Sequence, residues 1–219
     1  MQTDGKNNAD GPQIDEGSPR APVQTERVYV FERRCAVLQA LGYSMKKRTL
    51  GSKEANAFGA LAGLIPCIAA VVIFVFVSSP RALFPQFVAG DFFLTAAAAV
   101  VSLFVHECLH AFGWAAVKGG FSGIRLGIAK PYFNPYCTCS EPICRSGYLF
   151  GGLLPFLLLG VGLTAWGIVG GYTAIFVLGA FNMIASGADL LLSVFALCSG
   201  CGLCLDHPNE CGFYFFRKK

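Results

Sequence analysis

The chain has 219 residues, of which 54% are apolar and only 14% charged, and its mean hydropathy is +0.56. This composition largely excludes a soluble globule, and it excludes a disordered chain outside the polar start. Nine of the 17 Lys and Arg residues precede residue 57 and three more close the chain, so the net charge of +4 lies at the ends. Such ends are attracted to an anionic membrane face, and they lack the basic stripe that nucleic-acid binding needs.

The first 56 residues differ from the rest of the chain. Residues 1–26 are polar and predict a disordered cytosolic tail, with no cleavable signal peptide. Residues 27–56 mix apolar and basic side chains and predict a cytosolic or interfacial segment. We therefore expect the 10 cysteines to be reduced thiols and not a disulfide framework.

Four apolar runs predict four transmembrane helices, near residues 57–78, 92–117, 148–169 and 172–197. The first run holds 22 residues without a charge, which at about 1.5 Å each are enough to cross the hydrocarbon core. Gly170 and Gly171 predict a tight turn between the last two runs. The expected fold is an all-α polytopic membrane protein, with a membrane-embedded domain over residues 57–215.

The loops predict the orientation of these helices. The first loop has only Arg81, and the third has no Lys or Arg. The second loop, residues 118–147, holds four basic residues: Lys118, Arg125, Lys130 and Arg145. By the positive-inside rule, we expect a multi-pass protein of the cell membrane with both termini and this loop in the cytoplasm. The alternation over residues 124–128 predicts a short strand or re-entrant hairpin in that loop.

The second apolar run contains the pattern HExxH. On a helix, His106 and His110 lie on one face and can bind one Zn²⁺, while Glu107 is placed to act as general base. A charged group inside a membrane costs about 2.5 to 3.5 kcal/mol on insertion scales, so function is the default interpretation. A buried, hydrogen-bonded His and Glu cluster is the alternative. A di-iron site would need a second Glu-x-x-His motif, and the chain has none.

Asp189 is the predicted third zinc ligand. It is the only acid in the fourth run, and counting residues from the cytoplasmic ends of the two helices places it at the same depth as His110. Small residues 186–188 would let its helix approach the HExxH helix closely. A protonated Asp189 that is hydrogen-bonded between helices is the alternative. Asn182, two turns earlier, is a weak candidate for substrate binding, and an interhelical hydrogen bond explains it at least as well.

Other residues have weaker claims to a site. Cys198, Cys201 and Cys204 form a closely spaced run, with Cys211 beyond it and Cys137, Cys139 and Cys144 in the second loop. Together they could form a second, structural zinc site or a redox element, but small buried thiols are the simpler interpretation. Trp114 is predicted to be an interfacial anchor. His207 is predicted to be a turn residue or a group that supports a metal ligand from behind.

The motifs HECLH, PYCTCSEPICRSGY, LLPF, SGADL and DHPNECGF occur in that order over roughly residues 57–215. In this the chain resembles the integral-membrane putative zincin peptidase family, and the resemblance implies a multi-pass metallopeptidase. The scheme is also distantly similar to site-2 proteases, in which HExxH and an Asp of a later helix hold zinc. The chain departs from them because Leu190, and not Gly, follows Asp189.

These observations predict a membrane-embedded zinc metallopeptidase that hydrolyses peptides or membrane proteins near the cytoplasmic leaflet. A non-proteolytic metal-binding protein or scaffold subunit is the alternative. Glu107 favours the enzyme, because a pure binding site has no need of a carboxylate between its ligands. A transporter is disfavoured, because the sequence gives no evident sign of broken helices with polar positions at the midplane.

Overall fold

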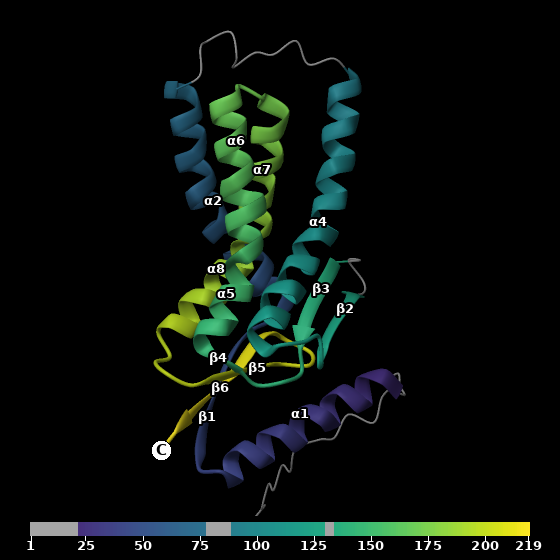
Figure 1. The fold of residues 1–219 in the computed structure, drawn as a ribbon, viewed down its shortest axis with the longest axis vertical. Coiled ribbons are helices and arrows are strands. Elements are labelled where there is room, and N and C mark those ends of the chain that lie inside the picture. The colour runs from purple at the N-terminus through teal and green to yellow at the C-terminus, as the bar shows by residue number, and fades with distance from the viewer. Residues whose placement is uncertain (1–21, 78–88, 130–133) are drawn as a thin grey trace, which may run out of the picture.

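The computed structural model describes residues 22–77, 89–129 and 134–219. A bundle of helices stands above a small sheet and one further helix (Figure 1). The bundle is formed by α2 (Ser52–Val77), α4 (Ala89–Lys118), the run α5 (Arg145–Pro155), η1 (Phe156–Gly162) and α6 (Leu163–Gly170), and the pair α7 (Thr173–Ala185) and α8 (Gly187–Leu197).

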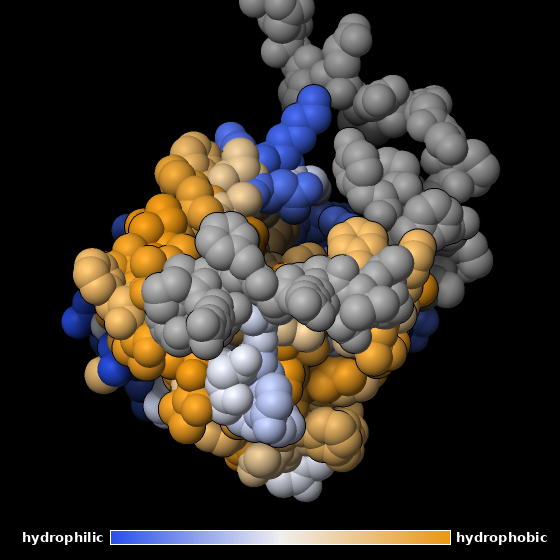
Figure 2. Space-filling view, turned by 90° about the horizontal axis from the view of Figure 1, so that it is seen from above, coloured by the Kyte–Doolittle hydropathy of each residue, from blue (hydrophilic) through white to orange (hydrophobic). Residues whose placement is uncertain are grey.

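Three helical stretches are long and apolar enough to cross a membrane: Ser52–Val77, Phe92–Lys118 and Arg145–Gly170. The pair α7 and α8 passes the same test together and gives a fourth crossing if it is counted as one span. Large apolar side chains are exposed along these helices, and Figure 2 shows the hydrophobic surface from above. Water disfavours so much exposed apolar surface, so the fold is that of a multi-pass membrane protein.

The expectation of an all-α fold is wrong, because the described residues also form two antiparallel sheets. One has four strands in the order β1-β6-β5-β4, namely β1 (Tyr43–Leu50), β4 (Ile143–Cys144), β5 (Leu203–Asp206) and β6 (Cys211–Lys218). The other is a hairpin of β2 (Ile124–Ala129) and β3 (Asn134–Cys139). The hairpin predicted between the second and third spans is therefore present.

The inner strands β5 and β6 of the four-stranded sheet are covered on both faces, while the edge strand β1 is half-buried or exposed along its length. One face carries Leu205 and Phe216, which pack on Cys35 and Leu38 of α1 (Pro22–Ala40). Residues 22–26, expected to be disordered, are the start of this helix, while residues 1–21 lie outside the described residues. The other face carries Phe213 and Phe215, which pack under the bundle. Tertiary packing therefore stabilises α1, which has little amphipathic pattern of its own.

The fourth apolar run is not one straight helix. It breaks at Ser186, where α7 and α8 meet at a bend of 47°. Just after the break, a Cβ on Gly187 would lie 1.8 Å from the Gly59 carbonyl oxygen and 2.8 Å from the Gly63 nitrogen. The small residues of this region thus allow a close crossing with α2. These small residues were expected to pack against the HExxH helix, α4. That expectation is wrong, because they pack against α2.

Candidate metal centre

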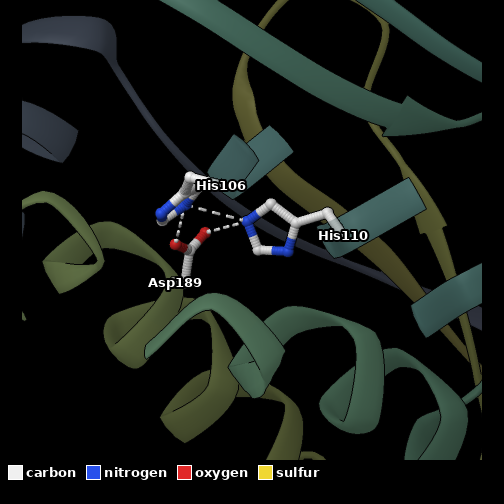
Figure 3. Close-up of side chains that lie close together, drawn as sticks. All are labelled: His106, His110 and Asp189. Atoms are coloured by element: carbon white, nitrogen blue, oxygen red, sulfur yellow. Dashed lines mark hydrogen bonds and ion pairs between the residues drawn. The ribbon is translucent and has the colours of Figure 1, made fainter. Parts of the chain in front are cut away.

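Two elements bring three potential ligands together. His106 and His110 lie one turn apart on α4, and Asp189 lies in the first turn of α8. The three side chains point toward one another (Figure 3). Their ligand atoms all lie within 4.8 Å of one another, and this is the one such group of His, Cys, Asp and Glu in the described part of the chain. Both histidines are buried, while the Asp189 side chain keeps 21% of its surface exposed.

The distances within this cluster fit a tetrahedral ion. His106 Nε2 lies 3.1 Å from His110 Nε2 and 3.0 Å from Asp189 Oδ2, and His110 Nε2 lies 3.4 Å from Asp189 Oδ1. Two ligands at about 2.05 Å from zinc and a tetrahedral angle apart are separated by about 3.3 Å. Two imidazoles and one carboxylate are also a usual zinc donor set. These residues therefore fit zinc in spacing and in chemistry.

The orientation of His110 is fixed from behind by a backbone carbonyl. Its Nδ1 lies 2.9 Å from the Gly151 oxygen, which can only accept, so Nδ1 carries the proton and Nε2 keeps a free lone pair for a metal. In a regular helix the Gly151 carbonyl would accept from the N–H of residue 155, which is Pro155 and has none. Pro155 thus leaves this carbonyl available to His110. This pair was not predicted from the sequence.

Trp114 supports the same ring from another side, so its prediction as an interfacial anchor is wrong. It is 4% exposed and stacks on His110, with ring centroids 5.4 Å apart and planes at 17°. Its Nε1–H donates to the Tyr148 carbonyl oxygen at 3.2 Å. This contact is possible because Gly151 has no side chain: a Cβ there would lie 2.2 Å from Trp114 Cδ1. The crossing of α4 and α5 therefore depends on Gly151.

Glu107 lies beside the cluster and on the side of strand β3. Its carboxyl group interacts electrostatically with His106, His110 and Asp189, and it accepts a hydrogen bond from the Cys137 backbone. Glu107 is half-buried and not enclosed. A carboxylate in this position is near the cluster without belonging to the three potential ligands. Glu107 is therefore a candidate for a general base beside the cluster.

Asp206 is a second functional candidate that sequence reasoning missed. Its Oδ2 accepts from the Cys139 backbone N–H at 2.7 Å, and its carboxyl group also bonds the side chains of Tyr148 and Thr138. Burial raises the pKa of this carboxyl to about 6. Asp206 therefore links β5 to β3 and to α5, and Tyr148 stacks in turn on Trp114, behind His110. Its position in the DHPNECGF motif was the available signal.

Asn182 is completely buried, and its amide nitrogen donates to Ser102 Oγ at 3.1 Å and to the Leu178 carbonyl oxygen at 2.8 Å. The structure thus shows the interhelical hydrogen bond between α7 and α4. Its Oδ1 is buried and has no partner among the described residues. Asn182 is not part of the three-residue cluster, and a contact with substrate stays a prediction.

The remaining candidates lie elsewhere. Cys198 and Cys201 are exposed and Cys204 is buried, and the structure does not bring these three thiols together as a group that could hold a metal. His207 Nδ1 accepts from the backbone N–H groups of Asn209 and Glu210, at 3.2 and 2.9 Å. His207 therefore shapes a turn, as predicted.

Comparison with known proteins identifies the segment that holds the cluster. Residues 99–200 match the model of a family described as "Putative zincin peptidase". No curated protein and no solved structure matches the chain, so the similarity to site-2 proteases stays a prediction. The matched segment contains His106, Glu107, His110 and Asp189. The segment from residue 99 to residue 200, which holds the cluster, is therefore similar to the family of putative zincin peptidases.

Proposed function

We propose that the chain is a membrane-embedded zinc metallopeptidase that hydrolyses peptide bonds in a peptide or membrane-protein substrate. The observation that carries this proposal is the convergence of His106, His110 and Asp189 beside Glu107, within a segment similar to a family of putative zincin peptidases. We assign the zinc to the first three side chains and the role of general base to Glu107. The metal, when bound, polarises the peptide carbonyl and makes water more acidic, from a pKa of about 15.7 to about 7.

The chain's own residues account for the rest of the reaction. Glu107 takes the proton from the attacking water and then gives it to the nitrogen of the leaving amine, so that one water is consumed and two chain ends are released. The Gly151 carbonyl keeps the His110 ring in the tautomer whose Nε2 can ligate. The half-buried Glu107 and the partly exposed Asp189 leave an open side from which substrate can approach.

We further propose that the cleavage occurs near the cytoplasmic leaflet of the cell membrane. His110 is eight residues before Lys118, the last residue of α4, and this corresponds to about 12 Å along the helix axis. The sheets and α1 lie at the same end of the bundle (Figure 1). The basic loop between the second and third spans is also at this end, and the positive-inside rule assigns it to the cytoplasm.

A comparison of the parent with Glu107→Gln tests the proposed activity. The amide is nearly the same size but cannot take the proton from water, so we expect unchanged zinc content and no hydrolysis. The assay is an unbiased search for cleaved peptides in membranes that hold either protein. Fragments formed equally by both would remove Glu107 from the role of base. Bound zinc without any Glu107-dependent fragment would instead support a non-proteolytic metal-binding protein.

A further inference from the structure

A basic pocket lies away from the zinc cluster, at the edge of the four-stranded sheet. Its volume is about 280 Å³, and residues of β1, β6 and the end of α8 line it. Three of the lining residues are cationic: Lys46, Arg48 and Arg217. Two more, Ser44 and Ser199, carry hydroxyl groups, and no acidic residue lines the pocket. Its chemistry is suited to an anion with several acceptor oxygens.

The pairing of β1 with β6 shows which way these cations face. Lys46 lies opposite Phe215 and Arg48 lies opposite Phe213, and paired residues share one face of an antiparallel sheet. Phe213 and Phe215 are the residues that pack beneath the helix bundle, where Phe213 contacts Tyr148 of α5. The basic pocket is therefore on the sheet face that is turned toward the membrane helices, at the outermost strand β1.

The cations of this pocket have no anionic partner. Among the residues that the structure describes, no carboxylate pairs with Lys46, Arg48 or Arg217, and the buried Nε of Arg48 has no hydrogen-bond partner. Lys47, one residue along on the opposite face, shows the contrast, because its Nζ lies 2.7 Å from Glu210 Oε1. A buried N–H without an acceptor is costly, so the described residues leave the Arg48 side chain incompletely satisfied.

The height of the pocket indicates where such an anion would come from. Cys198 and Ser199, which line it, directly follow Leu197, the last residue of α8. The fourth pass leaves the hydrocarbon at this level, so the pocket opens in the layer of the lipid headgroups. Cations in this layer attract anionic phospholipids of the adjacent leaflet.

We propose that this pocket binds the phosphate group of an anionic phospholipid from the leaflet on the sheet side of the protein. Lys46, Arg48 and Arg217 supply the positive charge, and their terminal side-chain N–H groups donate to phosphate oxygens. The site is independent of the zinc cluster and of the proposed hydrolysis.

The test uses the full chain in phosphatidylcholine nanodiscs that contain a small fraction of phosphatidylglycerol, with native mass spectrometry to count the lipid retained. We expect the parent to retain phosphatidylglycerol in preference to phosphatidylcholine. Each cation near the surface contributes about a fivefold change in binding, so Lys46→Gln with Arg48→Gln should weaken retention about 30-fold. Lys46→Gln alone, at an exposed position, should weaken it about fivefold and guards against misfolding of the double variant.

The matched control is Arg33→Gln with Lys47→Gln, which removes the same charge from α1 and from the other face of the sheet. It should retain phosphatidylglycerol like the parent. Equal losses in both double variants would reduce the effect to general attraction and overturn the proposal. So would a parent without preference for phosphatidylglycerol. Inorganic phosphate that stabilises the parent in detergent, without retained phosphatidylglycerol, would make the occupant a free anion and overturn the lipid assignment.

Discussion

Pro155→Ala is a test of how the His110 ring is held. In the parent, the Gly151 carbonyl accepts from His110 Nδ1 at 2.9 Å, because Pro155 has no N–H to offer it. The alanine restores that N–H one turn along the helix, where it competes for the same oxygen. Loss of the hydrogen-bond partner of a metal-ligating histidine lowers metal affinity about 10- to 100-fold. The alanine N–H would only compete for the Gly151 oxygen, so we expect zinc affinity to fall about tenfold.

The same substitution should not weaken the fold. Alanine is about 3 kcal/mol better than proline inside a helix, which offsets the packing lost at this buried residue. Zinc affinity is measured by competition with a chelator of known affinity, alongside thermal unfolding. Pro66→Ala in α2 is the matched control, since its freed carbonyl belongs to another helix, and it should keep the parent affinity. An affinity of Pro155→Ala equal to the parent's would refute the role given to the Gly151 carbonyl.

Three further predictions concern other parts of the chain. Asp189→Asn should fold but bind zinc at least tenfold more weakly in the chelator competition, because the amide cannot replace the anionic ligand; an unchanged affinity would leave Asp189 outside the metal site. Because burial raises the pKa of Asp206 from 3.8 to about 6, its protonated form is favoured in the folded state. Its contribution to stability is complete below about pH 4 and lost as the pH rises through about 6, so the free energy of unfolding should fall in that window by up to about 3 kcal/mol, and Asp206→Asn should remove this fall. An impermeant maleimide should label the exposed Cys144, Cys198 and Cys201 in inside-out vesicles and not in intact cells. Labelling of these cysteines in intact cells would show that the proposed membrane orientation is the wrong way round.

The sequence predicts the parts of the molecule that depend on local spacing. The four-residue separation of His106 and His110 places both on one helix face in any helix, and the apolar runs predict the spans. The association of Asp189 with the two histidines followed from the cost of a lone carboxylate in an apolar helix. The structure brings the three together, although the fourth run bends at Ser186 and a residue count gives the depth of a side chain only in a straight helix.

The missed features depend on contacts between distant parts of the chain. The pairing of β1 with β6 joins residues such as Tyr43 and Lys218. The local sequence of a short basic strand does not indicate which distant segment it will pair with. The break before Gly187 lies where this residue packs closely on Gly59 of α2, and the transporter was disfavoured partly because the sequence shows no evident break. The role of Pro155 could not be predicted either. The Gly151 carbonyl that it leaves free matters only because the folded chain places His110 beside it.

X-ray absorption at the zinc edge of the purified protein tests the central assignment most directly. We expect two imidazole nitrogens and carboxylate or water oxygen around the zinc at about 2.0 to 2.2 Å, with no sulfur. His110→Ala should abolish this signal. A shell of sulfur atoms at about 2.3 Å that survives His110→Ala would place the zinc on the cysteines and contradict the account.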